Sequence, residues 1–121
     1  MNLMPTPIDG LFVAHSNRIG DERGSFMRLY CAQTFDAAGI GNHTPVQINH
    51  SVTRQTGTLR GLHYQHAPAL EGKIVRCLRG RVFDVAVDLR AGSKTFLQHH
   101  TIELSADNHQ AFIIPPGCAH G

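Results

Sequence analysis

The sequence predicts an all-β fold of mostly antiparallel strands with one short helix, and three observations support that prediction. Runs rich in β-branched and aromatic residues are short. Clusters of glycine, proline, asparagine and aspartate separate them at close spacing, which is typical of a sandwich or a barrel. Residues 82–88 alternate strictly, so that Asp84, Ala86 and Asp88 share one strand face and two valines share the other.

The expected strands follow one another along the chain. Arg79-Gly80 lies between two of them and predicts a tight hairpin turn. His99 and His100 are adjacent within another, so they cannot share a strand face and one of them should be exposed. The expected strands are residues 11–15, 25–30, 45–52, 58–65, 73–78, 82–88, 96–104 and 111–114.

One short helix is expected at residues 31–38. Cys31, Phe35 and Ala38 fall on one face at helical spacing. Gly39 follows directly and can adopt the left-handed conformation that ends many helices.

The composition is that of a single domain. A chain of 121 residues buries roughly two-thirds of its unfolded surface, which is enough for one hydrophobic core. With 41% hydrophobic and 17% charged residues, a disordered polymer is excluded, and no apolar run is long enough to span a membrane. The formal net charge of +2 is too small to indicate a nucleic-acid partner.

The cysteines and the N-terminus bear on location. The three cysteines are odd in number and far apart, so neither a disulfide framework nor a paired-cysteine metal site is expected. This indicates a reducing compartment. The N-terminus carries two prolines and has no basic region before an apolar stretch, so no signal peptide is expected. We therefore expect a cytoplasmic protein.

Chemistry concentrates around His63. In an extended segment 58–65, His63 and Gly61 lie on the face opposite Arg60, and Gly61 leaves room beside the imidazole. Lys73 opens the next strand, where its cation could neutralise an oxyanion formed when a proton is removed beside a carbonyl. The same residues also fit a hydrogen-bonded strand histidine and a solvated strand end, so spacing alone leaves both interpretations open.

Distinctive short motifs run along nearly the whole chain. They are Asp-Glu-Arg-Gly-Ser-Phe at 21–26, Gln-Ile-Asn-His-Ser at 47–51, the segment 57–65 with its Arg-Gly-Leu-His core, the segments 73–77 and 83–90, Ser93, Leu-Ser at 104–105, and Ile-Pro-Pro-Gly-Cys-Ala-His-Gly at 114–121. In this order and combination they resemble the dTDP-4-dehydrorhamnose 3,5-epimerase family, whereas a single Arg-Gly-Leu-His would not be specific.

The resemblance implies a cupin-like jelly roll that epimerises carbon 3, carbon 5 or both of a nucleotide-linked 4-keto-6-deoxy sugar, in deoxysugar and rhamnose biosynthesis, without a metal or other cofactor. His63 stands at the position of the family's general base, and Lys73 stands where the enolate oxygen is stabilised. The substrate contacts that the resemblance implies are Arg23, Phe26, Arg28, Gln47, Asn49, Arg60, Lys73 and His120.

The resemblance also implies a homodimer with exchanged N-terminal strands, in which Arg23 and Phe26 reach the nucleotide of the neighbouring subunit. Two positions near the nucleotide depart from the family pattern. Arg28 stands where glutamate is common, and Ile48 stands where aspartate is common. Replacing an acceptor by a cation should change the preferred base, sugar or phosphate geometry.

The family continues beyond the Ala-His-Gly motif, whereas this sequence ends at Gly121. There the family supplies a tyrosine acid and an aspartate that orients the histidine. Inversion needs one proton removed from one face and another delivered to the opposite face, so these 121 residues alone are expected to exchange protons slowly at most. Asp84 could orient a cationic partner, but its place on a polar strand face favours a solvated aspartate.

Two other function classes remain open. His63, His66, Glu71 and His120 offer nitrogen and oxygen ligands for a metal-dependent cupin enzyme. Cupin ligation needs two histidines separated by one residue, however, and His63 and His66 are three apart, so in a strand they face opposite ways. The other class is a non-catalytic sugar-nucleotide-binding protein, which the early end of the sequence favours.

Overall fold

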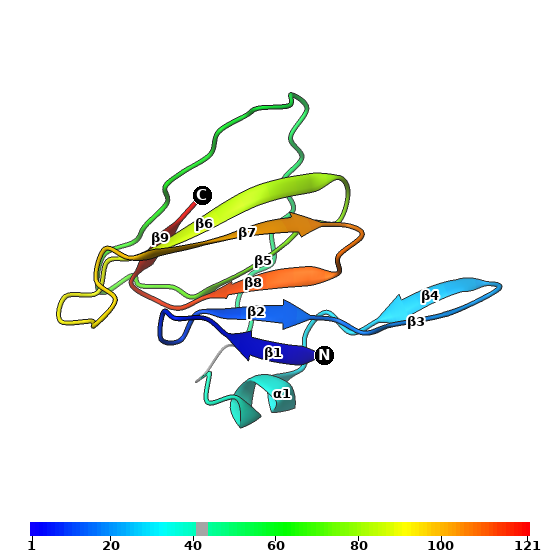
Figure 1. Cartoon of the computed structure of the whole chain (residues 1–121), viewed down its shortest axis with the longest axis horizontal. Coiled ribbons are helices and arrows are strands. Elements are labelled where there is room, and N and C mark those ends of the chain that lie inside the picture. The colour runs from blue at the N-terminus through cyan, green and yellow to red at the C-terminus, as the bar shows by residue number, and fades with distance from the viewer. Residues whose placement is uncertain (41–43) are drawn as a thin grey trace.

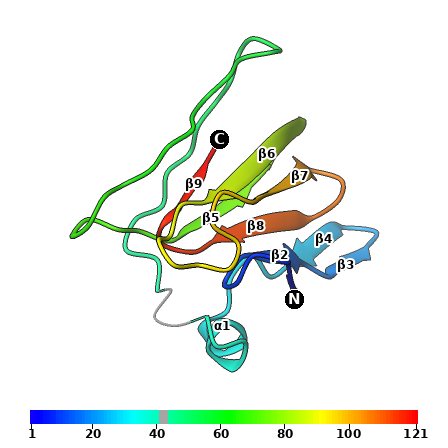
Figure 2. The same ribbon diagram turned by 60° about the vertical axis from the view of Figure 1, so that its left-hand side comes forward.

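The strands form two antiparallel sheets packed against each other, in a computed structural model that describes residues 1–40 and 44–121 (Figures 1 and 2). The four-stranded sheet has the order β1 (Asn2–Pro5), β2 (Phe12–His15), β8 (Gln110–Ile114) and β5 (Lys73–Arg76). The three-stranded sheet has the order β7 (His99–Ser105), β6 (Arg81–Asp88) and β9 (Cys118–His120). This arrangement confirms the predicted all-β, cupin-like jelly roll.

The hydrophobic core lies between the two sheets, because both contribute buried side chains to one cluster. Phe112 of β8 and Leu104 of β7 are the largest strand residues in it and are fully buried. Burying a side chain of this size contributes roughly 1.5–3 kcal/mol. The buried members of the cluster are Ile8, Leu11, Val13, Ala86, Leu104, Phe112, Ile114 and Cys118.

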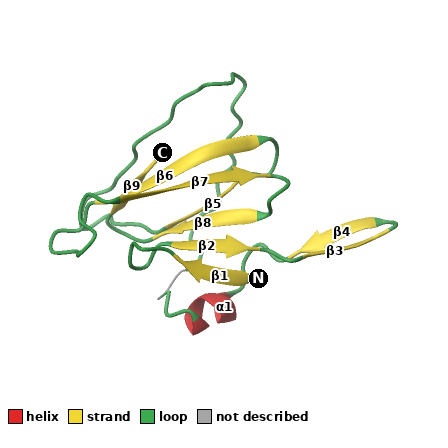
Figure 3. Ribbon diagram, viewed as in Figure 1, coloured by secondary structure: helices red, strands yellow, loops and turns green. Residues whose placement is uncertain are grey.

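α1 (Ala32–Ala37), drawn red in Figure 3, packs on the outer face of the four-stranded sheet. Phe35 of this helix packs in a second buried cluster with Ile113 of β8. Gly39 has φ of +69°, and its N–H donates to the Asp36 carbonyl at 3.0 Å while the Ile40 N–H donates to the Phe35 carbonyl at 3.1 Å. This is the Schellman pattern, so the predicted helix and its glycine end are confirmed.

A two-stranded hairpin extends away from the sheets (Figure 1). It consists of β3 (Arg18–Asp21) and β4 (Gly24–Met27), with Arg23 in the turn. Ile19 and Phe26 face each other across its strands and are 71% and 70% exposed. The hairpin therefore exposes an apolar pair of side chains to solvent.

The predicted strands at 73–78, 82–88 and 111–114 correspond to β5, β6 and β8. Those at 11–15, 25–30 and 96–104 are shifted or shorter, as β2, β4 and β7. The prediction omitted β1, β3 and β9. No helix of the described residues has the length and apolar character needed to span a membrane.

Two predicted strands are wrong. Residues 45–52 and 58–65 lie in the long loop between α1 and β5, drawn green in Figure 3, where His63 forms an isolated bridge. Among the described residues, no strand pairs continuously with this loop, so its backbone N–H and C=O groups do not form a sheet. The predicted hairpin at Arg79-Gly80 is also wrong, because β5 pairs with β8 and β6 pairs with β7 and β9. The turn therefore joins one sheet to the other.

Candidate functional site

His63 and His120 form the centre of the candidate site. The His63 N–H donates to the His120 carbonyl at 2.7 Å, and the His120 N–H donates to the His63 carbonyl at 3.1 Å. A mutually hydrogen-bonded antiparallel pair places its two side chains on the same side. The ring centroids lie 5.9 Å apart, with 55° between the ring planes. The last strand therefore fixes an otherwise irregular loop segment and brings two imidazoles together.

Gly61 permits this bridge. A Cβ on Gly61 would lie 2.8 Å from the His120 carbonyl oxygen, which is closer than atoms can approach without a shift. The expectation that Gly61 leaves room beside the imidazole is therefore wrong, because backbone occupies that space. The expected alternation of Arg60 and His63 about a strand is wrong for the same reason as the strand itself.

Asp84 supports His120 from the neighbouring strand β6. Its Oδ1 lies 3.3 Å from His120 Nδ1, and the residue is only 4% exposed. Asp84, Ala86 and Asp88 are all buried, so the aspartate face of β6 points into the protein. The expectation of a solvated Asp84 is therefore wrong. With Nδ1 held by the carboxylate, His120 Nε2 has no hydrogen-bond partner among the described residues and is available to a ligand.

Lys73 stands at the start of β5, in the other sheet. Its Nζ lies 2.9 Å from Glu71 Oε1, and both side chains are partly buried. The pKa of Glu71 is lowered, first by the hydrogen bond from Lys73, with smaller contributions from Gln65 and from the charge of His120. Glu71 thus carries a negative charge beside Lys73 and within electrostatic range of His120. Its position two residues before Lys73 could have indicated this ion pair, which the sequence analysis did not predict.

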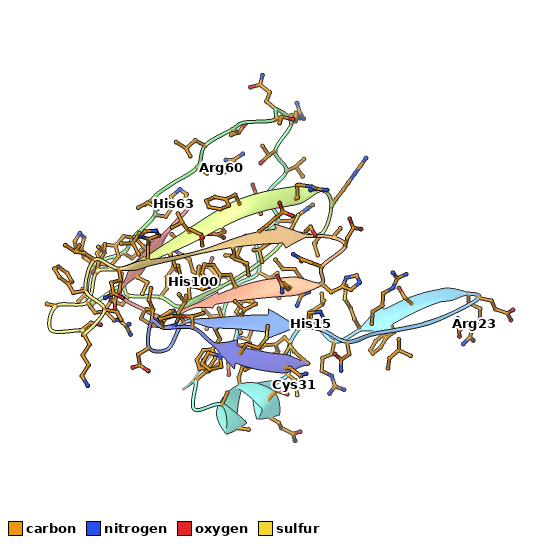
Figure 4. The ribbon with its side chains drawn as sticks, in the orientation of Figure 1. His15, Arg23, Cys31, Arg60, His63 and His100 are labelled. Atoms are coloured by element: carbon orange, nitrogen blue, oxygen red, sulfur yellow. The ribbon has the colours of Figure 1, made fainter. Side chains whose placement is uncertain are left out.

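The other predicted contacts lie elsewhere in this chain. Gln47, Asn49 and Arg60 are exposed in the loop between α1 and β5, where Arg60 Nε donates to Thr53 Oγ1 at 3.4 Å. Arg23 pairs with Asp21 at the hairpin tip, far from His63 (Figure 4).

Phe26 and Arg28 are also exposed, on and directly after β4. The carbonyl of Arg28 accepts a hydrogen bond from Ser16 Oγ at 2.8 Å, which fixes the backbone at the base of the hairpin. One chain therefore pairs His63 with His120 and places the Lys73–Glu71 ion pair within electrostatic range of His120, while the hairpin lies away from them.

No three histidine, cysteine, aspartate or glutamate side chains within 1–40 and 44–121 form a group that could hold a metal ion. His66 instead packs edge-on against Tyr64, with ring centroids 4.8 Å apart. The candidate ligand set of His63, His66, Glu71 and His120 is not gathered in this part of the chain.

A buried ionic network holds the loop that follows β6. Asp88 is fully buried and accepts two hydrogen bonds from the Arg90 guanidinium, at 2.8 and 2.9 Å. The Ser93 and Thr95 hydroxyls donate at 2.6 and 2.7 Å to Oδ2, the oxygen that also accepts the hydrogen bond from Arg90 Nη2. The Arg90 stem packs against Gly117, directly before β9. This network therefore supports the strand that carries His120.

Comparisons with known proteins bear on what this arrangement does. A family model described as dTDP-4-dehydrorhamnose 3,5-epimerase matches residues 5–121. The dTDP-4-dehydrorhamnose 3,5-epimerase of Shigella flexneri is 45% identical over 122 residues, which cover 100% of this chain and 66% of that protein.

Two solved structures are also similar. The dTDP-4-dehydrorhamnose 3,5-epimerase of Elizabethkingia anophelis has a TM-score of 0.93 at 42% identity, covering 99% of this chain and 65% of that one. The Legionella pneumophila epimerase, solved with dTDP-4-keto-L-rhamnose, has a TM-score of 0.80 at 40% identity, covering 98% and 62%. The chain spans about two thirds of the length of these relatives.

Proposed function

Because this chain belongs to the dTDP-4-dehydrorhamnose 3,5-epimerase family, we propose that it epimerises carbon 3, carbon 5 or both of a nucleotide-linked 4-keto-6-deoxy sugar. The proposed substrate is of the dTDP-4-dehydro-6-deoxyglucose type, and no metal takes part. The observation that carries the proposal is the pairing of His63 with His120, whose imidazole is in turn held by buried Asp84. Lys73 supplies the cation that the same chemistry requires.

The proposed reaction begins with proton removal. The sugar ketone makes the hydrogens on its neighbouring carbons acidic, and the neutral imidazole of His63 takes one of them. The electron pair of the broken C–H bond forms the C=C bond of an enolate, and the negative charge moves to the former ketone oxygen. Lys73 stabilises that charge. An acid or a solvent molecule on the opposite face then gives a proton to the carbon, which inverts its configuration and restores the ketone, and the imidazolium of His63 releases its proton to solvent.

The proposed role of His120 is to hold the sugar. Asp84 fixes its Nδ1, so Nε2 keeps a constant direction and can bond to a sugar oxygen. We assign Gln47 and Asn49 to the substrate as well, since both are exposed on the loop that carries His63. Arg60 on the same loop suits a diphosphate, because guanidinium forms paired, charge-assisted hydrogen bonds with phosphate oxygens.

We further propose that residues 1–121 act as one domain in a homodimer with exchanged N-terminal strands. Arg23 lies far from His63 in the same chain (Figure 4), and Phe26 lies on β4 of the same hairpin, so a neighbouring subunit would have to bring them to a nucleotide. Arg28 is assigned to the same nucleotide contact. A closed two-fold pair satisfies this requirement for both copies.

We also propose a cytoplasmic location. The three cysteines are all free, which supports a reducing compartment.

Proton exchange tests the proposed reaction. In heavy water the unmodified chain should place deuterium on the carbons beside the ketone of dTDP-4-dehydro-6-deoxyglucose. His63→Ala should slow this uptake by about a hundredfold or more while dTDP still binds, because the base acts on the transition state. Retained exchange in His63→Ala would remove His63 from the role of base.

The lysines offer a matched pair for the same measurement. Lys73→Met should slow deuterium uptake by about a hundredfold, because the enolate loses its cation. Lys94→Met, on a loop outside the site, should leave the rate unchanged. Exchange that stops with a chelator and returns with iron, manganese or zinc would favour a metal-dependent cupin enzyme instead.

A further inference from the structure

His100 lies on the same inner face as His120. On β6, Ala86 pairs with His100 of β7 on one side and with His120 of β9 on the other. Residues directly opposite each other in neighbouring strands point to the same face of a sheet. Ala86 is fully buried in the core between the sheets, so all three residues point inward. The expectation that one of His99 and His100 is exposed is confirmed, since His99 faces outward.

The spacing of this row suits a small ligand. Neighbouring strands lie about 4.8 Å apart, so the backbones at His100 and His120 are separated by roughly twice that distance. Ala86 between them carries only a methyl group, so no large side chain of β6 separates the two imidazoles. A sugar ring held by His120 would therefore lie within reach of His100.

His100 contacts apolar side chains on the inner face, whereas the two aspartates on either side of Ala86, Asp84 and Asp88, are engaged by His120 and Arg90. The His100 ring packs against Phe112 with centroids 6.0 Å apart, and the next inward residue on β7 is Ile102, which packs against the core. The imidazole is half-buried and has no hydrogen-bond partner among the described residues. A neutral imidazole carries one donor and one acceptor. A ligand that covers this ring without bonding to it would leave those groups unpaired, whereas a ligand with a hydroxyl there would satisfy one of them.

We propose that His100 is a specificity-determining residue that forms a hydrogen bond with a ring hydroxyl of the bound nucleotide-linked 6-deoxyhexose. This inference rests on the proposed function, because it needs the sugar to be held by His120. It adds a sugar contact on β7, on the far side of Ala86 from His120. The contact selects for the sugar and does not involve the nucleotide.

Equilibrium binding separates these two parts of the substrate. The probes are dTDP and dTDP-6-deoxyglucose, which lacks the ketone and does not react. His100→Leu should weaken binding of dTDP-6-deoxyglucose by about fivefold to tenfold and leave the affinity for dTDP unchanged. His100→Gln, which keeps a donor and an acceptor, should recover most of the loss. His99→Leu, on the opposite face of the same strand, is the control and should change neither affinity.

The outcomes are distinguishable. Equal affinity of the unmodified chain and His100→Leu for dTDP-6-deoxyglucose would overturn the inference, and so would a parallel loss for dTDP. If the unmodified chain does not bind dTDP, the proposed function fails first. If His100→Leu melts well below the unmodified chain, His100→Val takes its place, and His100→Gln is compared with it in the same titrations.

Discussion

Gly61 and Gly121 pack backbone against backbone where the long loop meets the end of the chain. A Cβ on Gly61 would lie 2.8 Å from the Cα of Gly121, and a Cβ on Gly121 would lie 2.5 Å from the carbonyl oxygen of Arg60. Both distances are shorter than Cβ atoms tolerate, and the obstructing atoms belong to the backbone, which cannot rotate away. The two glycines therefore set how closely His63 can approach His120.

Gly121→Ala should consequently separate the two histidines. We expect a loss of about 1–3 kcal/mol in the free energy of unfolding and a fall of about tenfold in the rate of deuterium uptake, because the His63–His120 bridge is disturbed. Thermal melting and exchange measured on the same sample check both.

Gly61→Ala should have at least as large an effect, since Gly61 also has φ of +110°. Gly57→Ala is the matched control, because Gly57 lies in the same loop with φ of +79° but has open space around it. Gly57→Ala therefore introduces backbone strain without a steric clash. Equal losses in Gly57→Ala and Gly61→Ala would show that close packing is unimportant.

Asp84→Asn should slow catalysis without unfolding the protein. Asparagine keeps the shape of the side chain but turns a charge-assisted hydrogen bond to His120 into a weaker neutral one. We expect the rate of deuterium uptake to fall by about tenfold, with the affinity for dTDP within about twofold. Asp36→Asn, exposed on α1, should change neither. An unchanged rate in Asp84→Asn would mean that the carboxylate does not position His120.

Strands with continuous β-branched residues were predictable, and extended loops were mistaken for strands. Val46, Ile48 and Leu59 are each at least 90% exposed, although their spacing matches that of a half-buried strand. An alternating pattern of apolar residues indicates only that the backbone is locally extended. Whether a sheet forms depends on hydrogen bonding to a neighbouring strand. β3 went unpredicted for the opposite reason, since glycine and charged residues dominate it.

The resemblance named the residues of the candidate site, but it did not predict which side chains hold them in place. The resemblance named His63, Lys73 and His120 as candidates, and the structure pairs His63 with His120 and Lys73 with Glu71. Asp84 and Asp88 point inward, although charged side chains usually face solvent. Each has a partner that only the fold brings close, His120 for the first and Arg90 for the second. A buried charge without such a partner would be too costly, and no single-sequence pattern reveals the partner.

The hairpin should control assembly. Sedimentation at micromolar concentration should show a dimer, and Phe26→Asp should shift it toward monomer by raising the dissociation constant about tenfold to a hundredfold. Phe83→Asp is the matched control, because Phe83 is equally exposed at 70% but lies on β6. A monomeric unmodified chain that binds dTDP normally would contradict the exchanged-strand dimer.

Asp88→Asn should destabilise the protein by about 3 kcal/mol at neutral pH, because the Arg90 guanidinium loses the carboxylate that pairs with it. Asp21→Asn is the control. The pKa of Asp21 is also lowered by its arginine partner, Arg23, but that pair is exposed at the hairpin tip, so its loss should not change the melting temperature.

The pH dependence gives a second check on the same network. The Arg90 guanidinium, aided by the Ser93 and Thr95 hydroxyls, holds the pKa of Asp88 far below the ordinary value for aspartate. As the pH falls from about 5 to about 3, the unfolded chain therefore binds a proton at this residue while the folded chain does not, and the stabilisation is progressively lost. Asp88→Asn lacks this dependence, so its melting temperature should approach that of the unmodified chain as the solution is acidified. A difference in melting temperature that stays constant between pH 7 and about pH 3 would mean that ionised Asp88 does not stabilise the fold.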